Sequence, residues 1–122
     1  MNEDSVRNLY PKALIIDDEI DTCLLLGMLL KKFGISSVIA HNLADGFAML
    51  MTEKPLIIFL DNDLPDGRGI EYIEQIKKQI PTSKLVMMTA MSSLSKQALN
   101  LGADGFIEKP LDIHKIERIL HQ

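Results

Sequence analysis

Two stretches of this sequence place acidic residues directly after short apolar runs. Asp17 and Asp18 follow Ala13–Ile16, and Asp61 follows Leu56–Leu60. Carboxylates that lie close together repel one another unless a cation lies between them. A few carboxylate oxygens suit Mg²⁺, which keeps several of its waters and also binds phosphate oxygens. The chemistry that this pattern suggests is phosphoryl transfer, with Asp61 as the nucleophile.

Two further polar residues follow apolar runs later in the chain. Thr89 follows Leu85–Met88, and Lys109 comes shortly after Phe106-Ile107. A hydroxyl group and an ammonium group at the same edge of a sheet could bind the remaining oxygens of a phosphoryl group. We therefore expect Thr89 and Lys109 to lie beside Asp61.

The apolar runs alternate with segments of helical spacing, which predicts the elements that bring these residues together. Strands are expected at 13–16, 38–40, 56–60, 85–88 and 106–107, each followed by a helix, with helices at about 20–33, 69–80 and 94–101 and others beginning after Asn42 and Asp112. This alternation indicates a single α/β domain with a doubly wound, five-stranded parallel sheet and helices on both faces. Ligands bind such sheets at the carboxyl ends of the strands.

Local signals refine these expectations. Asn42 and Asp112 are expected to cap helices, with Asp45 in the register of a capping box. The helix at 20–33 has a broad apolar face that we assign to four residues: Leu24, Leu25, Met28 and Leu29. The segment 64–67, Leu-Pro-Asp-Gly, is a turn signal.

Length and composition limit the classes of function. The chain has 122 residues, enough for one domain, and its net charge of -4 gives no reason to expect direct binding to nucleic acid or to a membrane. A single cysteine, no signal-peptide pattern and no apolar run long enough to span a bilayer favour a cytoplasmic protein. We expect residues 1–11 to form a flexible arm and 12–122 to form the domain.

Taken in order, the motifs resemble the response-regulator receiver domain of two-component signalling. They are Asp17-Asp18-Glu19, Asp61 with Leu64-Pro65 and Gly69, Thr89-Ala90, and Gly102-Ala103-Asp104 before Phe106 and Lys109-Pro110. The resemblance covers about 13–120 and implies a flavodoxin-like fold, similar to that of chemotaxis regulators, with strand order 2-1-3-4-5. It also implies a cis peptide bond before Pro110.

The resemblance implies how the acidic residues would work. Asp61 would be the phosphoacceptor, taking its phosphoryl group from a phosphohistidine of a histidine kinase or a phosphotransfer protein. Asp17, Asp18, Asp61 and the main-chain carbonyl group of Asp63 would hold Mg²⁺, with Mn²⁺ as an alternative. The protein would then be a signalling phosphoacceptor and not an enzyme, apart from catalysing its own phosphorylation and dephosphorylation.

The resemblance also implies how the signal would leave the site. Thr89 would hydrogen-bond the phosphoryl group and move towards it, and Lys109 would pair with it. Phe106 would swing inward as the aromatic partner of the Thr89 switch and change the partner-binding face. The recipient would be a downstream protein or a covalently linked output domain. The chain departs from the usual pattern between Thr89 and Lys109, where it is two residues shorter.

Two other classes of function fit parts of the pattern. Asp61-Asn62-Asp63 is a D-x-D sequence after an apolar run and resembles the haloacid-dehalogenase-type phosphatases, with Asp63 as general acid. In that family the second acidic pair comes late in the chain, whereas Asp17-Asp18 comes early here. The third class is an interaction module of the same fold that acts without phosphorylation.

Overall fold

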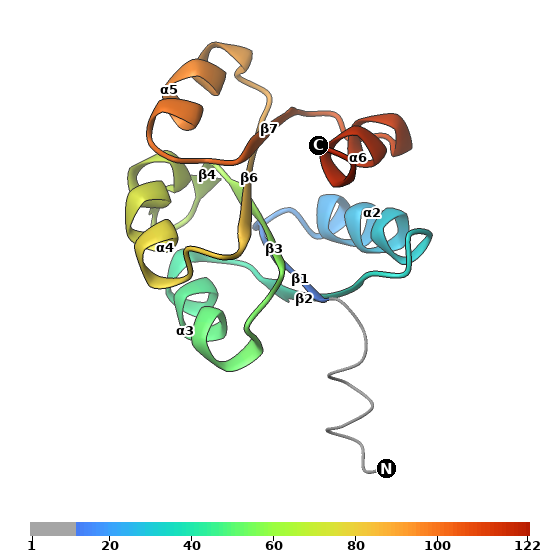
Figure 1. Ribbon diagram of the computed structural model, residues 1–122, viewed down its shortest axis with the longest axis horizontal. Coiled ribbons are helices and arrows are strands. Elements are labelled where there is room, and N and C mark those ends of the chain that lie inside the picture. Colours follow the sequence, from blue (N-terminus) through green and yellow to red (C-terminus); the bar gives the residue numbers. More distant parts are fainter. Residues whose placement is uncertain (1–11) are drawn as a thin grey trace.

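The computed structural model describes residues 12–122, so the expected arm at 1–11 lies outside the described residues. Five parallel strands form the sheet: β1 (Lys12–Ile16), β2 (Ser36–Ala40), β3 (Ile57–Asp61), β6 (Lys84–Thr89) and β7 (Gly105–Glu108). Their spatial order is β2-β1-β3-β6-β7 (Figure 1). When these five strands are numbered 1 to 5 in chain order, this is the predicted order 2-1-3-4-5.

Helices cover both faces of this sheet, as the alternation predicts (Figure 1). The helices α2 (Ile20–Lys31) and α6 (Ile113–Leu120) lie on one face. The opposite face carries α3 (Leu43–Glu53), α4 (Ile73–Gln79) and α5 (Ser95–Asn100). Within residues 12–122, no helix is long and apolar enough to cross a membrane.

The central strand β3 contributes to the hydrophobic cores on both faces. All five of its residues are buried. Ile58 and Leu60 pack in the core under α3, α4 and α5, whereas Ile57 and Phe59 pack in the core under α2 and α6. Side chains of a strand alternate between the two faces of a sheet, which explains this division. A strand buried on both faces fixes its last residue, Asp61, firmly at the edge of the sheet.

The helix α2 differs from its prediction in the face that it buries. Of the four residues assigned to its apolar face, only Leu29 is buried, whereas Leu24, Leu25 and Met28 are 57%, 41% and 65% exposed. The residues that α2 buries are Cys23, Leu26, Leu29 and Leu30. The assignment was wrong because α2 has apolar side chains on more than one face. The spacing of these residues alone therefore does not show which face is buried.

The expected helix caps and turn are confirmed. The side chain of Asn42 accepts a hydrogen bond from the Asp45 amide, and that of Asp112 accepts one from Lys115. The segment at 64–67 is the turn of a small hairpin formed by β4 (Asp63–Leu64) and β5 (Gly67–Arg68).

Two further local features concern the later part of the chain. The helices predicted at 69–80 and 94–101 each open with a 3-10 turn, η1 (Gly69–Tyr72) and η2 (Ser92–Leu94). The peptide bond between Lys109 and Pro110 is cis.

The chain after Asp61 is held by the main chain and side chain of Asn62. The amide of Asn62 donates to Met88 O at 3.2 Å, and its carbonyl accepts from Gly69 at 2.8 Å. Its buried side chain accepts a further hydrogen bond from the Ile70 amide at 3.0 Å. A Cβ atom built on Gly69 would lie 2.3 Å from the main-chain oxygen of Asp61, so only glycine fits here. The hydrogen bonds of Asn62 and the close approach of Gly69 therefore hold the backbone of Asp61 in place.

We predict that Gly69→Ala destabilises the fold by about 1–3 kcal/mol, because the added methyl group would push against the backbone of Asp61. The matched control is Gly27→Ala in α2, where the new Cβ atom would meet only the Ser37 Oγ atom at 3.3 Å. Alanine is also the better helix former, so this variant should be neutral or slightly stabilised. Urea unfolding of both variants measures the effect, and equal stability of the two would contradict the proposed constraint.

Candidate functional site

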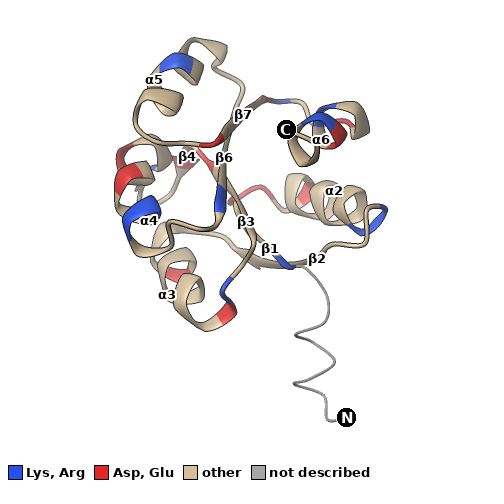
Figure 2. Ribbon diagram, in the orientation of Figure 1, with Lys and Arg blue, Asp and Glu red and all other residues tan. Residues whose placement is uncertain are grey.

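The polar residues predicted to share one edge of the sheet do lie at the carboxyl ends of its strands. Asp17 follows β1, Asp61 ends β3, Thr89 ends β6, and Lys109 follows β7. The amide of Asp17 donates to Ala40 O, and the amide of Lys109 donates to Thr89 O, each at 3.0 Å. The hydrogen bonding between neighbouring strands therefore extends as far as Asp17 and Lys109. Acidic residues mark the connection from β1 to α2 in Figure 2.

The ammonium group of Lys109 joins three carboxylates at this edge. Its Nζ atom lies 2.9 Å from Asp17 Oδ2, 3.0 Å from Glu19 Oε1 and 3.1 Å from Asp61 Oδ1. The side chains of Asp17 and Asp61 are 0% and 3% exposed, whereas that of Glu19 is 62% exposed. Two buried carboxylates therefore share one largely buried cation, which offsets part of their mutual repulsion.

This arrangement raises the pKa of both Asp61 and Lys109, for different reasons. Burial, and next the negative charge of Asp17, raise the pKa of Asp61 from 3.8 to about 6, although Lys109 opposes the shift. Burial alone would lower the pKa of Lys109, but hydrogen bonds to Asp17 and Glu19 and the charge of Asp61 raise it above its ordinary value. Lys109 therefore stays charged, while Asp61 is a more basic carboxylate than usual.

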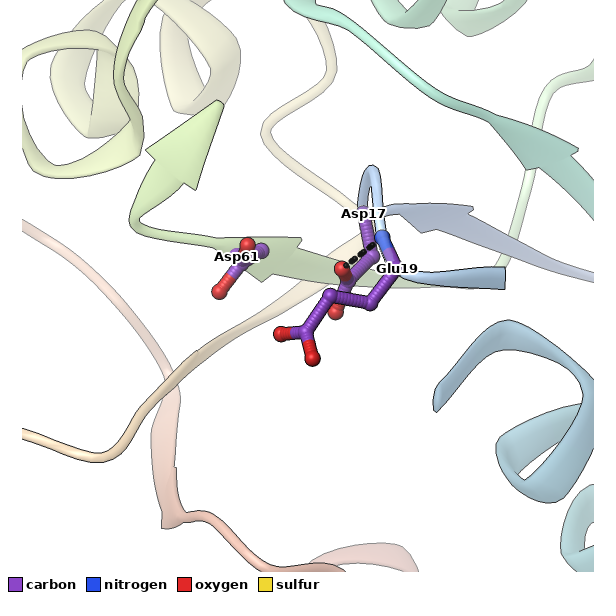
Figure 3. A group of neighbouring side chains, drawn as sticks. All are labelled: Asp17, Glu19 and Asp61. Atoms are coloured by element: carbon purple, nitrogen blue, oxygen red, sulfur yellow. Dashed lines mark hydrogen bonds between the residues drawn. The ribbon is translucent and has the colours of Figure 1, made fainter. Parts of the chain in front are cut away.

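Three carboxylates are placed so that they could hold a metal ion together. Oxygen atoms of Asp17, Glu19 and Asp61 all lie within 4.8 Å of one another. Figure 3 shows Asp17 and Glu19 on one side of this space and Asp61 on the other. An all-oxygen donor set with few protein ligands fits a hard cation such as Mg²⁺.

The metal ligands expected from the sequence are only partly brought together. Asp18 is exposed, and its carboxylate is not part of the close group that Asp17 and Asp61 form with Glu19. Asp63 lies in β4 with an exposed side chain, and its expected contribution is a main-chain oxygen. The structure adds Glu19 to the close acidic group. Glu19 is the third acidic residue in a row, but it does not directly follow a strand, so its place in the sequence did not mark it as a site residue.

The two expected switch residues lie on neighbouring strands. Thr89 is 1% exposed, and its hydroxyl oxygen accepts a hydrogen bond from the Met91 amide at 3.2 Å. Phe106 is half-buried and lines a cavity of about 580 Å³ together with Ser92 and Ser95. Phe106 pairs with Met87, two residues before Thr89 in β6.

Two residues that the sequence did not connect with the site contact the main chain of Asp17. Cys23 Sγ donates to the carbonyl oxygen of Asp17 at 3.3 Å, and His41 Nδ1 lies 3.0 Å from the same oxygen. Burial, followed by the negative charge of Asp17, raises the pKa of Cys23 to about 11, so that the thiol keeps its proton. Both side chains therefore help to fix the backbone of Asp17 from α2 and from the loop after β2.

Comparison with known proteins agrees with this geometry. A family profile described as the response regulator receiver domain matches residues 13–121. The response regulator protein PilR of Pseudomonas aeruginosa is 33% identical over 111 residues, which cover 89% of this chain and 25% of PilR. The chain spans between 25% and 61% of the length of its most similar curated relatives.

Solved structures show the same fold. A CheY-like response regulator receiver domain protein from Methanospirillum hungatei has a TM-score of 0.84 and 30% identity, covering 92% of this chain and 91% of that one. A response regulator from Burkholderia pseudomallei, solved with a phosphorylated aspartic acid and a calcium ion, has a TM-score of 0.82 and 25% identity, covering 90% of this chain and 66% of that one. With the profile matching nearly all of the described residues, the chain belongs to the response regulator receiver domains of two-component signalling, whose family function is to accept a phosphoryl group.

Proposed function

We propose that Asp61 is the phosphoacceptor of this receiver domain and takes its phosphoryl group from a phosphohistidine of a histidine kinase or phosphotransfer protein. The observation that carries this proposal is the contact of Lys109 with both Asp17 and Asp61 at the end of the central strand. A carboxylate, a second carboxylate and a cation within hydrogen-bond distance are the parts that phosphoryl transfer to an aspartate requires. The proposal also draws support from the phosphorylated aspartate of the Burkholderia relative.

The chemical step is an in-line displacement at phosphorus. A carboxylate oxygen of Asp61 attacks the phosphorus atom, a P–O bond forms, and the P–N bond to the imidazole ring breaks. The bonding electrons return to the ring nitrogen of the donor. The raised pKa of Asp61 makes its ionised form a better nucleophile than an ordinary carboxylate, provided that the pH lies above about 6.

Lys109 and Thr89 bind the transferred group in this proposal. The ammonium group already contacts Asp61 Oδ1, so it can pair with an oxygen of the phosphoryl group with little movement. The Thr89 hydroxyl oxygen accepts from the Met91 amide, and among the described residues its own hydrogen is not given to another group, so it can rotate towards a phosphoryl oxygen. Movement of Thr89 towards the phosphoryl group, followed by Phe106, would carry the signal to the face formed by α5, β7 and α6.

A divalent cation fits the acidic end of the sheet. We propose that Asp17, Asp18, Asp61 and the main-chain carbonyl of Asp63 hold Mg²⁺ or Mn²⁺, with Asp17 and Asp61 already within 4.8 Å of each other in the acidic group. When bound, the cation would neutralise the charge that develops on the phosphoryl oxygens. The exposed position of Asp18 leaves its carboxylate free to turn towards the ion.

We predict that Asp61→Asn abolishes phosphorylation, because an amide oxygen is a poor nucleophile and the product would not be an acyl phosphate. The protein is incubated with Mg²⁺ and acetyl phosphate, and its intact mass is measured. The wild type should gain one phosphoryl group in a form that base releases and EDTA prevents.

The matched control for this experiment is Asp21→Asn, which removes an exposed carboxylate from the first turn of α2 and leaves the proposed ligands in place. It should still accept one phosphoryl group. An adduct on Asp61→Asn would refute the assignment of the nucleophile. A folded wild type that gains no adduct would favour an interaction module that acts without phosphorylation.

A second prediction concerns stability and pH without divalent cations. The folded state raises the pKa of Asp61 to about 6, so ionising Asp61 costs folding free energy that grows from about pH 4 to pH 6. Asp61→Asn cannot ionise and should therefore be more stable than the wild type by about 1–3 kcal/mol at pH 7.5. The difference should shrink towards pH 4.

Urea unfolding in EDTA at several pH values between 4 and 7.5 measures this difference. Saturating Mg²⁺ should then stabilise the wild type more than the variant, because Asp61 supplies a ligand. A difference in unfolding free energy that stays constant over this pH range would contradict the argument from burial.

A further inference from the structure

Glu19 contacts the ammonium group of Lys109, although the proposed function assigns it no role. Its Oε1 atom accepts a hydrogen bond from Lys109 Nζ at 3.0 Å. Glu19 is the N-cap residue of α2, yet its side chain makes no capping hydrogen bond. Among the described residues, the hydrogen bond to Lys109 is thus the contact that holds this carboxylate. The ion pair joins the beginning of α2 to the chain that follows β7.

The ammonium group of Lys109 donates hydrogen bonds to Asp17 and Glu19 and forms an ion pair with Asp61. Carboxylate oxygens of Asp17, Glu19 and Asp61 all lie within 3.1 Å of its Nζ atom, so three negative groups already share this one cation. A phosphoryl group on Asp61 would add three acceptor oxygens and up to about two negative charges at the same place. A new bond from Lys109 to that group would compete with its present contacts to the carboxylates and weaken the one that is least firmly held.

The burial of the three carboxylates shows which bond is easiest to give up. Asp17 is fully buried, and its other oxygen is already held by the Glu19 amide at 2.9 Å. Removing Lys109 from Asp17 would leave a buried charge without its partner, which is strongly unfavourable. Glu19 is 62% exposed, so water can replace Lys109 at its carboxylate with little penalty.

We infer that Glu19 is a positioning residue that holds Lys109 towards α2 before phosphorylation and releases it to the phosphoryl group on Asp61. This inference rests on the proposed function of Asp61. The Glu19–Lys109 pair lies at a cavity of about 420 Å³ that Thr22, Leu25 and Pro110 also line. Glu19 competes with the phosphoryl group for one cation, so its carboxylate slows phosphorylation.

The test compares Glu19→Gln with Asp21→Asn. The first variant keeps the length of the side chain and removes the charge that contacts Lys109. The second removes the same charge from the first turn of α2 and from the same cavity, but among the described residues Asp21 makes no ion pair with Lys109. Circular dichroism first verifies that both variants are folded.

The rate of phosphorylation by acetyl phosphate at saturating Mg²⁺ should rise about two- to fivefold in Glu19→Gln, the range expected for losing an exposed ion pair. It should not change in Asp21→Asn. Equal rates for wild type and Glu19→Gln would overturn the inference. A loss of Mg²⁺ affinity of about tenfold or more, with an unchanged rate at saturation, would also overturn it, because Glu19 would then be a metal ligand.

A second measurement needs no phosphoryl transfer. In protein labelled with ¹⁵N-lysine, the signal of the Lys109 ammonium group should shift in Glu19→Gln, and its protons should exchange faster with water. The signal should stay in place in Asp21→Asn. An unchanged Lys109 signal in Glu19→Gln would overturn the inference, whereas a wild type that takes no phosphoryl group would overturn the proposed function instead.

Discussion

Within residues 12–122, the ammonium group of Lys109 is the positive charge that contacts the carboxylates at the carboxyl edge of this sheet. It lies within 3.1 Å of Asp17, Glu19 and Asp61, two of which are almost fully buried. Without a cation, two buried carboxylates this close would repel each other, and one of them would take up a proton. Lys109 therefore makes it possible for the fold to keep a charged aspartate at the end of its most buried strand.

The rest of the structure holds the two sides of this ionic contact in place. The Asn62 hydrogen bonds and the close approach of Gly69 fix the backbone of Asp61. Cys23 and His41 contact the main-chain carbonyl of Asp17 and so hold the backbone that carries the second carboxylate. In the proposed phosphoryl transfer, these contacts would keep both carboxylates in position while the Lys109 ammonium group pairs with the transferred group.

Much of this arrangement could be predicted from the sequence. A parallel sheet brings strand ends together, so Asp17, Asp61, Thr89 and Lys109 could be placed at one edge from apolar runs alone, and local capping signals located the helices at Asn42 and Asp112. The buried face of α2 could not be predicted, because Leu24 and Met28 are as apolar as the residues that the helix buries. Glu19 was missed because its contact depends on the direction of the Lys109 side chain, which no spacing rule specifies.

The most direct measurement of the central claim is the pKa of the Asp61 carboxyl group in the wild type and in Lys109→Gln. Titration followed by the ¹³C signal of the Asp61 carboxyl group, in EDTA, reports this value for each protein. If Lys109 offsets the repulsion between Asp17 and Asp61, the pKa of Asp61 should be about 6 in the wild type and clearly higher in the variant. An equal or lower pKa in Lys109→Gln would contradict the view that this cation holds the site together.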